Sequence, residues 1–87
     1  MKKYSRSTID KDVRRVLGKR LYKKCEEENG GWIFAERSNG DIEYHLNSDA
    51  YYKLRKYMLE HRNSRLYKSW VGIKDGYNVR FEIDSYY

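Results

Sequence analysis

The sequence contains a single cysteine, Cys25, among its 87 residues. One cysteine cannot form a disulfide within the chain, which excludes an internal disulfide framework and indicates a reducing compartment. No segment approaches the roughly 20 consecutive apolar residues that a membrane-spanning helix needs. The basic start of the chain, residues 1–10, is not followed by the apolar run of a secretory signal. We therefore expect a cytoplasmic protein.

Motifs for catalysis and for cofactors are also missing. The sequence has no Walker-type glycine loop and no dinucleotide fingerprint. Cys25, His45 and His61 lack a close metal-ligand spacing, and Cys25 is expected to be an inert core thiol. Glu43 and His45 share one face of an expected strand and could form the acid–base pair of a nuclease, but no nucleophile accompanies them. The sequence thus favours a non-catalytic protein, without cofactor or metal.

The length and composition fit one small folded domain, residues 1–87. A chain of this size buries only about 60–65% of its unfolded surface, so large apolar side chains have to supply the core. Aromatic residues make up 16% of the sequence, and ten of them are tyrosines, which provides the necessary area. Although 37% of the residues are charged, the apolar residues recur periodically, and this favours a folded chain over a disordered one.

Charge is unevenly distributed along the chain. The formal net charge is +6, but residues 1–24 contain ten Lys or Arg residues against only Asp10 and Asp12, a local balance of +8. The other 63 residues contain nine basic and eleven acidic residues, a balance of −2. This asymmetry predicts a surface that attracts polyanions, although a solvated basic helix that only keeps the protein soluble would have the same composition.

The first regular element expected is one long helix. Residues 1–6 are predicted to form a basic flexible arm, and Ser7 or Thr8 can cap the helix that follows. Gly18 lies in the middle of this helix, and the glycines at 30–31 are expected to end it. Its apolar stripe, at helical spacing, consists of Ile9, Val13, Val16, Leu17, Leu21 and Cys25.

A hairpin is expected next. Asn39-Gly40 is the pair that two-residue hairpin turns favour. Counting outward from such a turn places Ile33 and Ala35 on the same face as Tyr44, and this face is the better core face.

The second half of the chain is predicted to follow the same order. A helix over about residues 49–62 is capped by Ser48, and its apolar side consists of Ala50, Tyr51, Leu54, Tyr57, Met58 and His61. A final hairpin starts near Trp70 and turns at Asp75-Gly76. We therefore predict an α+β fold with the order α-β-β-α-β-β, in which two layers consist of a four-stranded antiparallel sheet and two helices that cover one of its faces.

The two hairpins resemble each other in sequence. Residues 42–48 match residues 79–85 in their alternation, and Trp32 matches Trp70. Segments 7–48 and 49–87 are therefore candidates for two half-repeats of an internal duplication. Alternation alone would also align any two amphipathic hairpins.

Basic residues follow the outer side of both predicted helices. Four of them are spaced by four along the first helix and would form a ridge about 18 Å long. Phosphates along a nucleic-acid backbone suit such a layer, because each neutralised phosphate releases counterions. The residues predicted to contact nucleic acid are Lys11, Arg14, Arg15, Lys19, Lys23, Lys53 and Lys56.

The outer sheet face is expected to expose aromatic rings among carboxylates. Glu36, Glu43 and Glu82 would repel phosphate there, so this face suits a protein partner better than single-stranded RNA. Alternatively, the rings only pack on one another. The residues predicted for a protein interface are Trp32, Phe34, His45 and Trp70.

Two functions of different classes follow. The first is a small basic nucleic-acid-binding protein that docks phosphates on its helical layer and is not catalytic. The second is a phage or mobile-element protein that binds and inhibits a host protein such as a defence nuclease, because the chain is small, proline-free and rich in the Tyr and Arg typical of interface hot spots. A homodimer joined through Trp32, Phe34 and Trp70 is a further alternative. The sequence identifies neither DNA nor RNA nor a particular partner.

Overall fold

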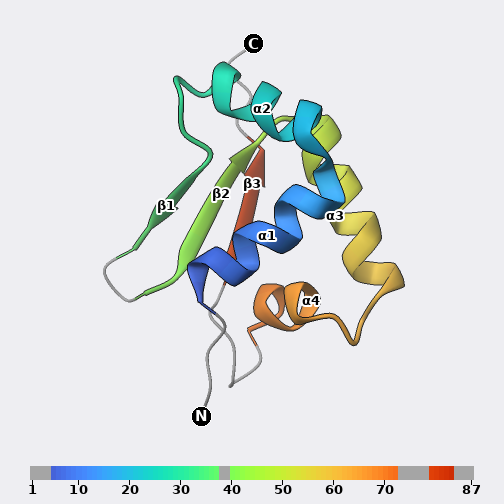
Figure 1. The fold of residues 1–87 in the computed structure, drawn as a ribbon. Helices are drawn as coiled ribbons and strands as arrows, with labels where there is room; N and C mark the ends of the chain where they lie inside the picture. The colour runs from blue at the N-terminus through green and yellow to red at the C-terminus, as the bar shows by residue number, and fades with distance from the viewer. Residues whose placement is uncertain (1–4, 38–39, 73–78, 84–87) are drawn as a thin grey trace.

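The computed structural model describes residues 5–37, 40–72 and 79–83. Within these residues the chain forms four helices and a three-stranded sheet, which confirms the predicted α+β class. Figure 1 shows the helices gathered beside one face of the sheet. The elements are α1 (Arg6–Leu17), α2 (Lys19–Glu28), β1 (Phe34–Glu36), β2 (Ile42–Leu46), α3 (Ser48–Glu60), α4 (Arg65–Trp70) and β3 (Val79–Ile83).

The first helical segment is interrupted, so the prediction of one long helix is wrong. α1 ends before Gly18 and α2 begins after it, because Gly18 has a φ of 82° and a ψ of 157°. Only glycine adopts this conformation without strain. The Gly18 N–H donates to the carbonyl of Arg14 at 2.9 Å and closes the end of α1. Arg6, predicted in the basic arm, belongs to α1, and residues 1–4 lie outside the described part.

The first hairpin forms where it was predicted, but its register differs by one residue. Phe34 is paired with Tyr44 and Ala35 with Glu43, whereas the two-residue turn would have paired Ala35 with Tyr44. Three residues separate the hydrogen-bonded Arg37 and Asp41, and Gly40, the last of them, has a φ of 92°. A one-residue shift moves every side chain of a strand to the other face. Phe34 therefore lies on the core face.

The second half of the chain does not form a hairpin like the first. α3 starts where the second helix was predicted, but the stretch around Trp70 is helical, since α4 extends to this residue with Ser64 as its N-cap. The predicted turn at Asp75-Gly76 lies outside the described residues. β3 pairs with β2 in parallel, which requires the chain to cross over through α3 and α4.

The predicted sheet is corrected accordingly. Within the described residues the sheet has the order β1-β2-β3, with one antiparallel and one parallel pair, and not four antiparallel strands. The described parts of segments 7–48 and 49–87 do not fold alike, because helix α4 stands in the second half where strand β1 stands in the first. The internal duplication itself stays a prediction.

The core lies between the helices and the sheet. From the sheet it includes Ile42, Tyr44, Leu46 and Val79, and from the helices it includes Ile9, Val13, Leu17, Ala50, Leu54, Met58 and Leu66, all of them at most 2% exposed. The predicted apolar stripes of the first segment and of α3 are thus confirmed at these helical positions. Such burial of periodic apolar side chains is what fixes amphipathic helices against a sheet.

A polar network anchors α1 within this arrangement. Oδ1 of Asp10 accepts hydrogen bonds from the hydroxyls of Tyr22 at 2.6 Å and of Tyr44 at 2.8 Å. Oδ2 of Asp10 accepts one from Nε of Arg14 at 2.7 Å. Asp10 of α1 is therefore hydrogen-bonded to both α2 and the central strand β2. These bonds fix the rotation of α1 about its axis, and so fix which of its side chains face solvent.

Candidate functional site

A groove of about 430 Å³ lies between α1 and α3. It runs along the exposed sides of the two helices, whose other sides carry the core residues. Its lining residues are Arg15, Val16, Lys53, Lys56, Tyr57 and Glu60. Three of the seven residues predicted to contact nucleic acid thus meet in one hollow. We call Arg15, Lys53 and Lys56 the basic groove.

Arg15 is held in the groove by a buried carboxylate. Its Nη1 donates to Oδ1 of Asp12 at 3.1 Å, and its Nη2 lies 3.5 Å from the hydroxyl oxygen of Tyr57. The hydrogen bond with Tyr57 and the charge of Asp12 raise the pKa of Arg15, so the Arg15 guanidinium stays protonated and positively charged. The Arg15 side chain is still 61% exposed, which leaves part of the guanidinium open to a ligand.

The carboxylate of Asp12 forms ion pairs with two arginines, Arg15 and Arg65. Arg65 at the start of α4 donates from Nε to Oδ2 at 2.6 Å and from Nη2 to Oδ1 at 3.0 Å. Asp12 is only 2% exposed. Asp12 thus joins the guanidinium groups of Arg15 and Arg65 beside the groove. A neighbouring hollow of about 340 Å³, which Arg15 and Arg65 both line, continues the basic groove toward α4.

The two lysines of the groove differ in their contacts. Nζ of Lys53 donates to the carbonyl of Leu17 at 3.3 Å and satisfies a free carbonyl at the end of α1. Lys56 is exposed, and it forms no hydrogen bond or ion pair with any described residue. A further hollow of about 310 Å³, lined by Lys56 and Arg55, continues along α3. Of the three cations of the basic groove, Lys56 is therefore the one most available to a ligand.

The other predicted contact residues do not form a single ridge. The break at Gly18 puts Lys11 on α1 and Lys19 and Lys23 on α2, all exposed. Arg14 is engaged within the protein: besides its bond to Asp10, its guanidinium carbon lies 4.1 Å from the ring centre of Tyr22. The ridge of four residues spaced along one helix is therefore wrong, and the convergence of α1 and α3 replaces it.

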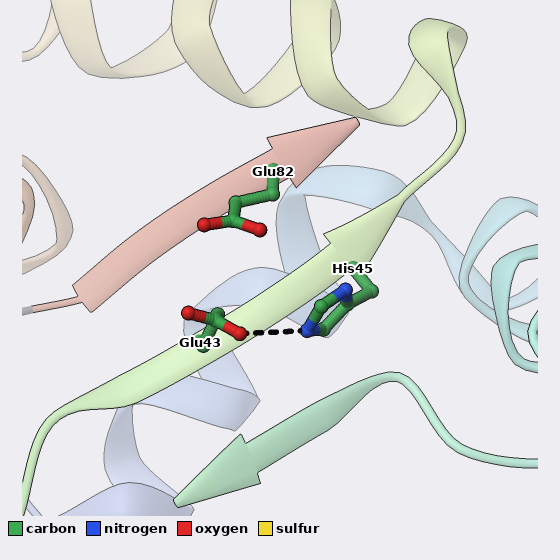
Figure 2. Close-up of side chains that lie close together, drawn as sticks. All are labelled: Glu43, His45 and Glu82. Carbon is green, nitrogen blue, oxygen red and sulfur yellow. Dashed lines mark hydrogen bonds and ion pairs between the residues drawn. The ribbon is translucent and has the colours of Figure 1, made fainter. Parts of the chain in front are cut away.

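A second cluster lies on the opposite, outer face of the sheet. Figure 2 shows Glu43 and His45 of β2 and Glu82 of β3 pointing toward one another. Nε2 of His45 is 2.9 Å from Oε1 of Glu43. One nitrogen or oxygen atom from each of the three side chains lies within 4.8 Å of the others. We call these three residues the Glu-His-Glu cluster.

The strand pairing explains this cluster. In the parallel register His45 stands opposite Glu82, and side chains two residues apart on a strand share a face. The sequence correctly placed all three residues on the outer face. It did not show that His45 and Glu82 are neighbours, because the predicted four-stranded antiparallel sheet contained no parallel pairing of residues 42–46 with residues 79–83. A search of the sequence for metal ligands among cysteines and histidines alone also overlooks the two carboxylates.

The four residues predicted for a protein interface lie in different surroundings. Trp32 is 45% exposed, and its ring packs edge-on against His45 with 4.9 Å between the ring centres. Phe34 faces the core instead, 5.5 Å from the ring of Tyr44, with the guanidinium of Arg6 over its other side. Trp70 ends α4 and packs against the core. Contrary to the prediction, Phe34 and Trp70 therefore do not share the outer face with Trp32 and His45, whereas a protein interface and a homodimer stay predictions.

Glu36 is also misplaced by the predicted register. It pairs with Ile42 across the hairpin and forms an ion pair with Arg6 of α1 at 2.8 Å. It therefore belongs to the helical side and not to the outer face.

Cys25 and His61, the remaining residues with reactive side chains considered in the sequence, line neither the groove nor the Glu-His-Glu cluster. Cys25 is buried, and this burial raises the pKa of its thiol, which fits the predicted inert core thiol. His61, at the end of α3, stacks on Tyr57 with 4.3 Å between the ring centres. None of the helices in the described part of the chain combines the length and apolar composition needed to cross a membrane.

Comparison of the chain with protein-family models, with curated proteins and with solved structures found no match.

Proposed function

We propose that the protein binds the phosphate backbone of a nucleic acid through the basic groove and does not catalyse a reaction. The convergence of Arg15, Lys53 and Lys56 on one hollow between α1 and α3 carries this proposal. A concave surface lined by cations suits the ridge of a sugar-phosphate backbone. Each neutralised phosphate releases bound counterions, and this release drives association.

The three cations would play different parts. Arg15 is oriented by Asp12 and Tyr57, and an oriented guanidinium can fork onto two phosphate oxygens. Lys56 is free to follow a phosphate as a point charge. Lys53 stays near the end of α1, where it adds positive potential. The exposed Lys11, Lys19 and Lys23 would extend the attraction beyond the groove.

Such contacts predict affinity with little reading of base sequence. Phosphate contacts fix position, whereas sequence is read at base edges. We therefore expect binding to several sequences with comparable affinity, in the cytoplasm, where the free thiol of Cys25 would stay reduced.

The test is fluorescence anisotropy with labelled duplex DNA, duplex RNA and single strands over a range of salt. We expect the affinity to fall steeply between about 50 and 200 mM salt. Lys56→Glu should weaken binding about tenfold, because it removes a phosphate contact and adds a repulsive charge. Lys24→Glu on α2, which makes the same change of charge away from the groove, is the matched control. Equal losses in both variants, or no binding by the parent protein, would contradict the proposal.

A second candidate function is favoured by the exposed ring of Trp32 on the outer face. Tryptophan is enriched among residues that dominate protein interfaces, and inhibition of a host protein such as a defence nuclease would use this face. A pull-down from nuclease-treated lysate separates the two functions. A stoichiometric protein partner that is lost on Trp32→Ala and kept on Lys56→Glu would favour the second function.

A further inference from the structure

We propose that the Glu-His-Glu cluster binds a divalent transition-metal cation on the outer face of the sheet. The ligand atoms of Glu43, His45 and Glu82 already lie within 4.8 Å of one another. The 2.9 Å between Oε1 of Glu43 and Nε2 of His45 is near the roughly 3.3 Å between two ligands of a tetrahedral zinc ion with bonds of about 2.0 Å. This inference uses residues outside the basic groove and does not depend on nucleic-acid binding.

The three ligands differ in freedom, and this difference suits capture of an ion. Glu43 is 7% exposed, and the His45 side chain is 16% exposed, so packing restricts both. Glu82 is exposed on β3. Its carboxylate can therefore change rotamer and close the remaining distance to the other two ligands. Two held ligands and one adjustable ligand would form the site with little movement of the backbone (Figure 2).

The cluster offers two carboxylates to a cation. A carboxylate that leaves water, as Glu43 does, needs compensation by positive charge. Arg37 supplies part of it, since its Nη2 lies 3.7 Å from Oε2 of Glu43, and Arg80 stands opposite Glu43 on β3. Glu82 adds a second carboxylate beside His45. A cation held by both carboxylates would interact favourably with each.

The ligand types select the class of metal. An imidazole nitrogen suits zinc, copper, iron or nickel, and carboxylates are accepted by these ions as well. Magnesium and calcium prefer oxygen ligands alone. Three protein ligands leave at least one coordination position for water, as in open zinc sites. The ring of Trp32 packs on His45 and restricts the imidazole, and ligand orientation of this kind strengthens metal sites.

The experiment is a competition titration of the full chain with Zn²⁺ against a fluorescent zinc chelator near neutral pH. We expect one zinc ion per chain, with weaker binding of Mn²⁺ and much weaker binding of Mg²⁺ and Ca²⁺. Glu82→Gln, at an exposed position where folding should be unaffected, should weaken zinc binding at least about tenfold. Glu60→Gln and His61→Gln are the matched controls for loss of a carboxylate and of the other histidine, and they should bind zinc like the parent protein.

Fluorescence of Trp32 gives an independent measurement. In a Trp70→Phe background, Co²⁺ should quench the remaining tryptophan, because Trp32 contacts the ligand His45, and Glu82→Gln should shift this quenching to higher Co²⁺ concentration. Circular dichroism verifies that each variant is folded. Absence of zinc binding by the folded parent protein, or equal zinc affinity in the parent protein and Glu82→Gln, would overturn the proposal.

Discussion

The two candidate sites present charge in different ways. In the basic groove the cations sit at the ends of long side chains from separate helices. Arg15 is oriented by Asp12 and Tyr57, and Lys53 is held by the carbonyl of Leu17. In the Glu-His-Glu cluster, short side chains project from two paired strands, and the strand register fixes their separation. Long flexible cations suit a ligand of repeating charge, whereas closely spaced ligand atoms suit one small ion.

The two sites are also separated by the core. Tyr44 lies at the centre, between the rings of Phe34 and Phe81, and its hydroxyl reaches Asp10 on the helical side. Glu43 and His45, its neighbours in β2, point to the other side. The basic groove thus lies on the helical side, and the Glu-His-Glu cluster lies on the outer sheet face. This separation lets each site be disrupted without the other.

The largest effect expected is from Asp12→Ala. The substitution leaves Arg15 and Arg65 facing each other without the buried carboxylate that they share. Loss of one partner from a buried ion pair costs about 3–5 kcal/mol, and because both arginines are partly exposed we expect about 3 kcal/mol of unfolding free energy. Urea unfolding measures this loss.

Asp49→Ala, in the exposed first turn of α3, is the control and should cost less than about 1 kcal/mol. In the folded fraction, Asp12→Ala should leave the zinc affinity of the outer face unchanged. A zinc affinity that falls together with stability would show that the two sites are coupled.

The sequence predicted the parts of this fold that depend on periodicity. The apolar stripe from Ile9 to Cys25 and the core side of α3 followed from spacing alone. The sequence also placed Glu43, His45 and Glu82 on one face, because alternation along a strand does not depend on its partner.

The strand pairing and the groove could not be predicted from the sequence, because they depend on contacts between residues that are distant in the chain. Residues 79–83 alternate in the same way whether β3 pairs in parallel or antiparallel, so the meeting of His45 with Glu82 could not be predicted. The groove likewise results from the packing of α1 against α3, and neither helix shows it alone. The register of the first hairpin depended on loop length, which Asn39-Gly40 did not determine.

A smaller effect is expected from Gly18→Ala. An added Cβ would meet no atom within 4 Å, so the cost lies in the backbone conformation, with its φ of 82°. Residues other than glycine are strained there by about 1–3 kcal/mol, and we expect about 2 kcal/mol. Urea unfolding measures the loss, and Lys19→Ala, at a regular helical position, should stay within about 0.5 kcal/mol of the parent protein.

The alternative outcome of Gly18→Ala is equally informative. Alanine favours helix, so α1 and α2 could fuse into the single helix that the sequence predicted. Residues 10 and 22 would then lie about 18 Å apart along one axis, and the hydrogen bond from Tyr22 to Asp10 could not form. A gain of helical circular dichroism together with unchanged stability would show that the break is not needed for the fold.

The smallest effect expected concerns the tyrosines between the two sites. Burial first, and then the proximity of Asp10, raise the pKa values of Tyr22 and Tyr44 above those of ordinary tyrosines. A group whose pKa is higher in the folded state stabilises the protein fully below its unfolded pKa, and this contribution is lost as the pH rises above that value. The free energy of unfolding should therefore fall above about pH 10, by about 1.4 kcal/mol per pH unit for Tyr44 alone.

Urea unfolding at a series of alkaline pH values tests this, with Tyr44→Phe compared with Tyr52→Phe. Tyr52 is 58% exposed, so its removal should leave the pH dependence unchanged, whereas Tyr44→Phe should make the decline above about pH 10 shallower. Tyr44→Phe should also cost about 1 kcal/mol near neutral pH, because Asp10 loses one of its donors. The free energy of unfolding of the two variants could instead decline equally with pH. In that case the hydroxyl of Tyr44 would not be the buried link between the helical side and the central strand, and the independence of the two surfaces would need another physical basis.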